Sequence, residues 1–179
     1  MKNQSKIFKF EIFSIIFTFV LGTLLHFTFE WSNSNSLVGA FSTINESTWE
    51  HLKLLFYPML LSTIIGYFYL SKDVTNFLCS RIFGALSSML FTLTSFYTYS
   101  GILGSNISIL NIAIFYIAVL IGEYVSYKLM LSSFNCNNKV ALILFSVFLF
   151  FFVFFTYFPP RIGLFKDPAN GRYGIVKTI

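Results

Sequence analysis

The chain has 179 residues, of which 56% are hydrophobic and only 11% are charged, and its formal net charge is +5. Because soluble domains carry about 25% charged residues, this composition excludes an ordinary water-soluble domain. We expect the lipid bilayer, and not nucleic acid, to be the main partner of the chain.

Four runs contain no Asp, Glu, Lys or Arg: residues 12–29, 54–71, 82–122 and 140–160. Roughly 20 helical residues cross a hydrocarbon core of about 30 Å, so each run is long enough to span it. As one helix the third run would measure about 60 Å, and Ser100–Asn106 at its middle has turn composition. The sequence therefore predicts a single all-α transmembrane domain over residues 1–179. Its five helices are expected at about 8–29, 48–71, 79–99, 107–130 and 139–158, followed by a tail over 159–179.

Basic residues predict the orientation of the bundle. Seven of them precede the first helix or flank the two loops on its side: Lys2, Lys6, Lys9, Lys72, Arg81, Lys128 and Lys139. The positive-inside rule places this side in the cytoplasm, and five crossings then place the C-terminus outside. The basic residues of the tail do not follow this rule, because five crossings place them outside. The Phe, Ile, Asn and Lys bias is that of an AT-rich bacterial genome, so we expect the cytoplasmic membrane of a bacterium.

Both cysteines, Cys79 and Cys136, fall on the predicted cytoplasmic side. Thiols in that compartment are kept reduced. The sequence therefore predicts two free thiols without a disulfide role.

Histidines and carboxylates gather at the predicted external ends of the first two helices. His26 and Glu30 are four residues apart and share a helix face, and Glu46 and Glu50 have the same spacing. Mixed His and Glu sets hold divalent metal ions in helical bundles. We therefore name His26, Glu30, Glu46 and Glu50 as candidate metal ligands. Without a metal, the candidate catalytic groups are Glu46, Glu50 and His51, with one carboxylate as general base.

A purely structural interpretation of the same segment stays open. Ser47 to Glu50 has the form of a capping box, in which Ser47 accepts from the Glu50 amide while the Glu50 carboxylate reaches back. Trp31 and Trp49 would then be interfacial belt residues. Lys53 would form a weak surface pair with Glu50. On this interpretation the cluster is a hydrogen-bonded polar cap that stabilises the bundle.

Glu123 is an ionisable residue inside the fourth predicted helix. At that depth it costs roughly 3 kcal/mol or more unless it is paired, hydrated or neutral. It is either a functional proton site or a residue that bonds tyrosine hydroxyls or pairs with Lys128 or Arg81. Glu11, beside Lys9, is interpreted as an interfacial residue.

The C-terminal tail has its own chemistry. Two prolines at 159–160 end the last helix, and Asp167–Gly171 has the composition of a turn. On the predicted topology Asp167, Arg161 and Arg172 lie on the side of the His and Glu cluster. The arginines would pair with its carboxylates and close the external face. A disordered basic tail is the alternative.

Three stretches carry a resemblance to a known family. They read Leu-Gly-x-x-Leu-His-Phe-x-x-Glu-Trp over 21–31, Asn-Glu-Ser-Thr-Trp-Glu-His-Leu-Lys-Leu-Leu-Phe-Tyr-Pro-Met over 45–59, and Asp-Pro-x-x-Gly-x-Tyr-Gly over 167–174. The chain resembles, over nearly its whole length, a family of small uncharacterised multi-pass membrane proteins from Gram-positive bacteria. The resemblance implies the membrane class and localisation, and it brings no activity, substrate or ligand.

Three functions remain open from the sequence. The first is an accessory or structural membrane protein with a polar external cap. The second is a membrane-embedded, metal-dependent enzyme that acts at the outer leaflet, and the third is a small proton-coupled transporter that uses Glu123. Protein partners and homo-oligomerisation are left open.

Overall fold

The computed structural model describes residues 3–134 and 136–175. The described residues form six α-helices and one 3-10 helix: α1 (Gln4–Trp31), α2 (Ser36–Gly39), α3 (Thr48–Leu70), α4 (Phe77–Leu103), α5 (Ser108–Leu131), α6 (Asn138–Tyr157) and η1 (Gly163–Phe165). All except α2 and η1 are long and apolar enough to cross a membrane. The predicted all-α class with five long apolar helices is confirmed, whereas α2 lies in a segment that was expected to be a loop.

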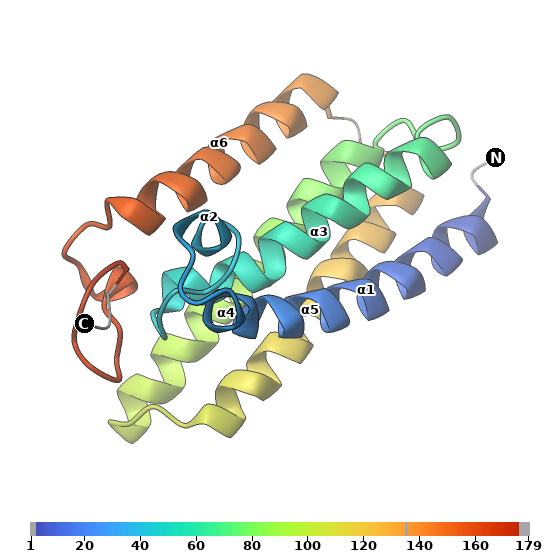
Figure 1. Ribbon diagram of the computed structural model, residues 1–179. Helices are drawn as coiled ribbons and strands as arrows, with labels where there is room; N and C mark the ends of the chain where they lie inside the picture. The colour runs from blue at the N-terminus through green and yellow to red at the C-terminus, as the bar shows by residue number, and fades with distance from the viewer. Residues whose placement is uncertain (1–2, 135, 176–179) are drawn as a thin grey trace.

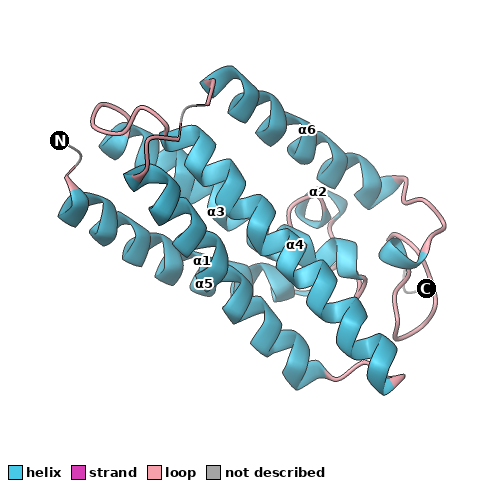
Figure 2. Cartoon of the chain, turned by 180° about the vertical axis from the view of Figure 1, so that it is seen from behind, coloured by secondary structure: helices cyan, strands magenta, loops and turns pink. Residues whose placement is uncertain are grey.

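The long helices run side by side, with α6 along one flank of the others (Figures 1 and 2). α4 packs against α3, α5 and α6, and α1 packs against α3 and α5. Two ends of the bundle can be distinguished. The N-terminal end holds Asn3 and the loops 71–76 and 132–137, apart from residue 135. The tail end holds residues 32–47, the turn at 104–107 and residues 158–175.

Local sequence signals set several helix ends. The Ser47 side chain accepts a hydrogen bond from the Glu50 amide at 3.4 Å, which is half of the predicted capping box. The other half is absent from the described contacts, because the Ser47 amide donates to Asn45 Oδ1 at 2.9 Å. α4 continues past the expected end at residue 99 and stops at Gly104, whose φ of +67° suits a residue without Cβ.

Small residues let α4 and α5 approach closely. A Cβ atom on Gly84 would lie 2.6 Å from the carbonyl oxygen of Gly122, and one on Gly122 would lie 1.9 Å from Ser88 Oγ. Ser88 also donates to the carbonyl oxygen of Ala118 at 2.8 Å. Close backbone approach through small residues is how helices associate where lipid removes the hydrophobic driving force.

Residues 158–175 of the tail dock on the tail end of α3, which does not agree with the alternative of a disordered tail. Trp49 is buried, with its ring 4.9 Å from the Phe165 ring and 4.8 Å from the Phe152 ring. Asn45 Nδ2 donates to the carbonyl oxygen of Gly174 at 3.1 Å. Trp49 is therefore a packing anchor for the tail and α6 and not the interfacial belt residue predicted.

The prediction of two free thiols is also wrong. Cys79, in the first turn of α4, and Cys136, just before α6, are joined by a disulfide. Their placement at one end of the bundle agrees with the sequence. The inference of reduced thiols rested on the compartment assigned from basic residues, and it did not foresee that residue 136 folds back onto the start of α4.

Candidate functional site

Three side chains converge at the tail end of the bundle: His26, Glu46 and His51. Glu46 Oε1 lies 3.9 Å from His26 Nε2, and Glu46 Oε2 lies 3.5 Å from His51 Nε2. One ligand atom from each residue can be chosen so that all three lie within 4.8 Å of one another. The side chains are partly open to their surroundings, with exposures of 32%, 52% and 26%. The structure thus brings together one residue each from α1, the 40–47 loop and α3.

The Nδ1 atoms of both histidines contact groups outside the cluster. His51 Nδ1 lies 3.0 Å from the carbonyl oxygen of Ser47, which can only accept a hydrogen bond, so this Nδ1 carries a proton. His26 Nδ1 lies 3.3 Å from Thr43 Oγ1, which also donates to the His26 carbonyl oxygen at 3.1 Å. These contacts orient both rings so that their Nε2 atoms face Glu46. Metal-binding histidines are oriented by the same kind of outer hydrogen bond.

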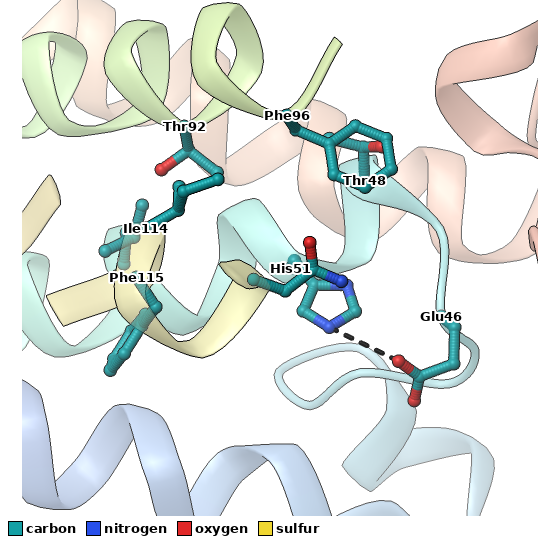
Figure 3. A pocket seen from close by; sticks show the side chains of 9 residues that line it. Glu46, Thr48, His51, Thr92, Phe96, Ile114 and Phe115 are labelled. Carbon is teal, nitrogen blue, oxygen red and sulfur yellow. Dashed lines mark ion pairs between the residues drawn. The ribbon is translucent and has the colours of Figure 1, made fainter. Parts of the chain in front are cut away.

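Cavities flank these three residues. A small cavity of about 40 Å³ is lined by Glu46 and His51 together with Thr92, Phe96 and Asn111. Figure 3 shows the first four of these residues around it. A larger cavity of about 260 Å³ shares His51 and Asn111 with it, and continues past His26 between α1 and α5. The walls of this larger cavity are mostly apolar. A third cavity, of about 380 Å³, lies under the tail, and Lys166 is among its lining residues.

Glycine positions α1 against this cavity. A Cβ atom on Gly22 would lie 2.6 Å from the carbonyl oxygen of Leu54 and 2.7 Å from the Phe115 ring. The bare backbone at Gly22 lets α1 approach α3 one helical turn before His26. The sequence signal for the site is therefore the Gly22 to His26 spacing together with the loop that carries Glu46.

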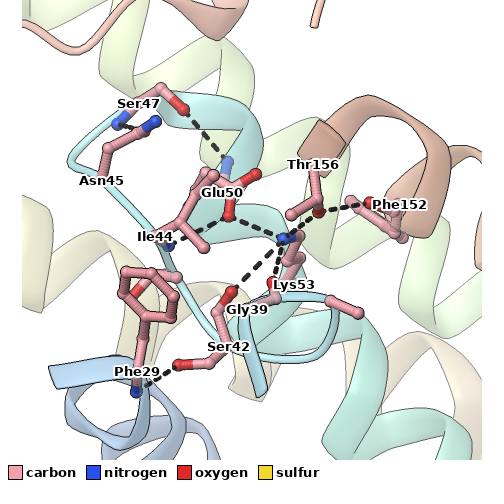
Figure 4. A network of polar contacts seen from close by, with 12 residues as sticks. Phe29, Gly39, Ser42, Ile44, Asn45, Ser47, Glu50, Lys53, Phe152 and Thr156 are labelled. Carbon is pink, nitrogen blue, oxygen red and sulfur yellow. Dashed lines mark hydrogen bonds and ion pairs between the residues drawn. The ribbon is translucent and has the colours of Figure 1, made fainter. Parts of the chain in front are cut away.

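Glu50 belongs to a second polar network, in which it also accepts from the Ile44 amide at 3.2 Å (Figure 4). It is 2% exposed and pairs with Lys53, whose Nζ lies 2.7 Å from Glu50 Oε2. Lys53 Nζ also donates to the carbonyl oxygens of Gly39 and Ser42 and to Thr156 Oγ1. The predicted surface pair is in fact a buried junction of the 36–47 loop, α3 and α6.

The other candidate residues at this end lie outside the three-residue group. Glu30 is exposed at the end of α1. Arg161 and Arg172 are exposed, and neither takes part in an ion pair within residues 3–134 and 136–175. Asp167 is buried and accepts from the Ala169 amide at 2.8 Å and from Asn170 Nδ2 at 2.6 Å. The tail therefore closes over the bundle through aromatic packing and a local turn.

A second cluster of charged residues is buried toward the N-terminal end. Arg81 Nη1 lies 3.2 Å from Glu11 Oε2 and also donates to Glu123 Oε2. All three side chains are between 0% and 4% exposed. Glu123 pairs with Arg81, which is one of its expected partners, while Lys128 lies over the Tyr124 ring at 5.7 Å. Glu11 is a core residue and not the interfacial one predicted.

Four hydroxyl groups complete the Arg81 cluster: Ser14, Ser62, Thr63 and Ser126. Arg81 Nη2 donates to Ser14 and Ser62 at 2.8 Å each, and Nε donates to Thr63 at 3.1 Å. Ser126 donates to Glu11 Oε1 at 2.9 Å, and Ser14 donates to Glu123 Oε1 at 2.8 Å. No pattern in the sequence predicted these hydroxyl groups as partners of the charged residues. The available signal was that three charged residues occur at similar depths in the first, third and fourth long helices.

Comparison with known families gives one match. Residues 1–175 match the family of unknown function DUF6512. The chain belongs to this family. No curated protein and no solved structure matches the chain. DUF6512 membership accords with the resemblance to an uncharacterised family and assigns no activity.

Proposed function

We propose that this DUF6512 protein is an integral membrane protein that binds a divalent metal ion through His26, Glu46 and His51. The observation that carries the proposal is the convergence of two Nε2 atoms on one carboxylate, with both Nδ1 atoms in contact with groups outside the cluster. Imidazole and carboxylate ligands suit Zn²⁺ and related transition metals. Ligand atoms within 4.8 Å of one another need only small side-chain rotations to meet an ion.

The basic residues of the N-terminal end favour a cytoplasmic position for that end, whereas the Cys79–Cys136 disulfide at the same end is uncommon in that compartment; the proposed orientation is based on the basic residues. With that end in the bacterial cytoplasm, the metal site faces the outer surface of the membrane. The start of α3, residues 36–47 and the tail then form an external cap over the metal site.

An enzyme that acts at the outer leaflet is the activity that this site supports best. Two imidazoles and one carboxylate leave a coordination position for water, as in hydrolytic zinc sites. A metal at this position would make that water a stronger nucleophile. The apolar cavity of about 260 Å³ beside His26 and His51 suits the chain of an amphipathic substrate.

An accessory membrane protein with a structural cap is the second candidate. The Lys53 network favours it, because four acceptors on the loop, α3 and α6 hold the cap together without a metal. The two candidates differ in whether a metal binds at all.

Metal titration of the purified protein tests the proposal. Protein in detergent is stripped with a chelator, and Zn²⁺ binding is followed by calorimetry and by the melting temperature. We expect one ion per chain and a higher melting temperature, and we expect His26→Ala and His51→Ala each to remove both effects. Metal-ligating residues typically contribute far more than tenfold in affinity, since even their outer-shell partners contribute 10–100-fold.

Two further variants complete the titration. Asp73→Asn, at the opposite end of the bundle, is the control and should bind Zn²⁺ like the unmodified protein. Glu30→Gln separates the three-residue set from the larger one predicted from the sequence, and we expect it to retain binding. Absence of stoichiometric metal, or binding that survives both histidine substitutions, would reject the metal site and leave the structural cap.

A further inference from the structure

The Arg81 cluster contains more acidic than basic groups. Glu11 on α1 and Glu123 on α5 both pair with the single guanidinium of Arg81 on α4. α3 contributes only the hydroxyls of Ser62 and Thr63 to it. Within the part of the chain that the structure describes, the ion pairs of both carboxyl groups are with Arg81 alone. Two ionised carboxylates would therefore leave the cluster with a net charge of −1.

Burial makes that charge costly. Arg81 and Glu123 are 0% exposed and Glu11 is 3% exposed, so water and mobile counter-ions are excluded. An uncompensated charge in such surroundings costs several kcal/mol and is normally removed by a proton. Two carboxyl groups that share one site do not both ionise readily. The geometry enforces this sharing, because Glu11 Oε2 and Glu123 Oε2 accept from the same nitrogen, Arg81 Nη1.

We propose that Glu11 and Glu123 together hold one proton at neutral pH, which makes the Arg81 cluster a buried proton-binding site. One carboxylate balances Arg81, and the other carboxyl group stays neutral. The two share the proton as a pair, so the site binds it as a unit. This site is independent of the metal proposed at the tail end.

The position of the cluster indicates where the proton would exchange with the medium and which helices its binding would affect. Glu11 and Glu123 lie about two helical turns, or roughly 10 Å, from the ends of α1 and α5 at the N-terminal end. The proton would exchange with the medium on that side when the helix ends separate. Because Glu11 lies on α1 and Glu123 on α5, a movement that parts these helices would end the sharing of Arg81 Nη1 by the two carboxyl groups. The cluster is therefore suited to coupling proton uptake to a change in helix packing.

Infrared spectroscopy of the full chain in detergent or liposomes tests the proposal directly. A protonated carboxyl group has a C=O stretching band that is separate from the carboxylate bands and that shifts in D2O. We expect this band at neutral pH in the unmodified protein. Glu11→Gln leaves one carboxylate for Arg81 and should abolish the band, and Glu123→Gln should abolish it as well.

The control is Asp73→Asn, whose carboxylate forms an exposed pair with Lys6 at the same end; it should leave the band unchanged. If Glu123→Gln fails to fold, Glu11→Gln decides alone, because it retains the Arg81–Glu123 pair. Absence of the band in the unmodified protein, or its persistence in Glu11→Gln, would overturn the proposal. Neither result would affect the metal titration, so the two proposals fail separately.

Discussion

The two ends of the bundle use the same kinds of side chain in opposite ways. At the N-terminal end, Arg81 is fully buried and every one of its nitrogens donates to a partner. At the tail end, His26 and His51 keep one nitrogen each facing Glu46, beside a cavity. The buried Arg81 cluster can accept a proton and no larger ligand. The group of His26, Glu46 and His51 has ligand atoms and space available for an ion.

Glu46 and Glu50 show the same contrast within one loop and helix start. Glu50 is buried, and its partner Lys53 binds backbone carbonyls from the 36–47 loop. Glu46 is about half exposed and faces the Nε2 atoms of His26 and His51. Because a buried charge must be compensated and an exposed one need not be, burial decides which carboxylate is structural. The four-residue spacing of Glu46 and Glu50 in the sequence does not indicate which of the two carboxylates is buried.

Arg81→Met is expected to have the largest effect. It removes the only cation paired with Glu11 and Glu123 in the described residues, and breaking a buried pair costs about 3–5 kcal/mol. The free energy of unfolding in mixed micelles measures the loss. Lys6→Met is the control, since its exposed pair with Asp73 should contribute about 1 kcal/mol or less. Equal losses in the two variants would show that the Arg81 cluster does not hold the bundle together.

Gly122→Ala is expected to have an intermediate effect next to Glu123. The added Cβ would lie 1.9 Å from Ser88 Oγ and 2.7 Å from the Gly84 carbonyl oxygen, so α4 and α5 must separate. Overpacking of this kind costs about 1–3 kcal/mol. Gly101→Ala is the matched control, because nothing lies within 4 Å of a Cβ there. A thermal melt that ranks Gly101→Ala as the more damaging change would contradict the close α4–α5 contact.

His51→Ala in metal-free protein is expected to have the smallest effect. The His51 side chain is 26% exposed and makes one hydrogen bond, to the Ser47 carbonyl oxygen, and such bonds contribute about 1 kcal/mol. With Zn²⁺ at a hundred times its dissociation constant, the unmodified protein should gain about 2.7 kcal/mol that the variant lacks. Chelator-treated and zinc-loaded samples compared by chemical unfolding provide both numbers. A large metal-free loss would assign His51 to the structure of the cap.

Much of the fold could be predicted from the sequence, because the bilayer requires long uncharged helices and the chain has few charges to place. The start of α3 at Thr48 followed from Ser47, a residue that caps through its own side chain. The convergence of His26 and Glu46 was also within reach, since both flank the same end of the bundle. These features depend on local chemistry and on the order of the helices.

Other features depend on contacts between residues far apart in the chain. The Glu11 carboxylate bonds Ser126, which is 115 positions away, and no local pattern in the first helix indicates this. The burial of Lys53 requires Thr156 from α6. The role of Trp49 changed for the same reason, because Phe152 and Phe165 cover it. Residue type predicted that these side chains matter and could not predict what they would touch.

The burial of Lys53 and Trp49 has a consequence for biogenesis. Both lie in α3, yet Thr156, Phe152 and Phe165, which cover them, are synthesised later. Chains emerge from the ribosome N-terminus first, so a nascent protein with its first four long helices inserted still lacks the Thr156 partner of Lys53 and exposes the Trp49 indole, although Glu50, Gly39 and Ser42 can already bind the ammonium group. Once α6 and the tail pack on α3, both side chains are covered. This difference in exposure would let a membrane quality-control protease distinguish a chain that lacks α6 from one that has it.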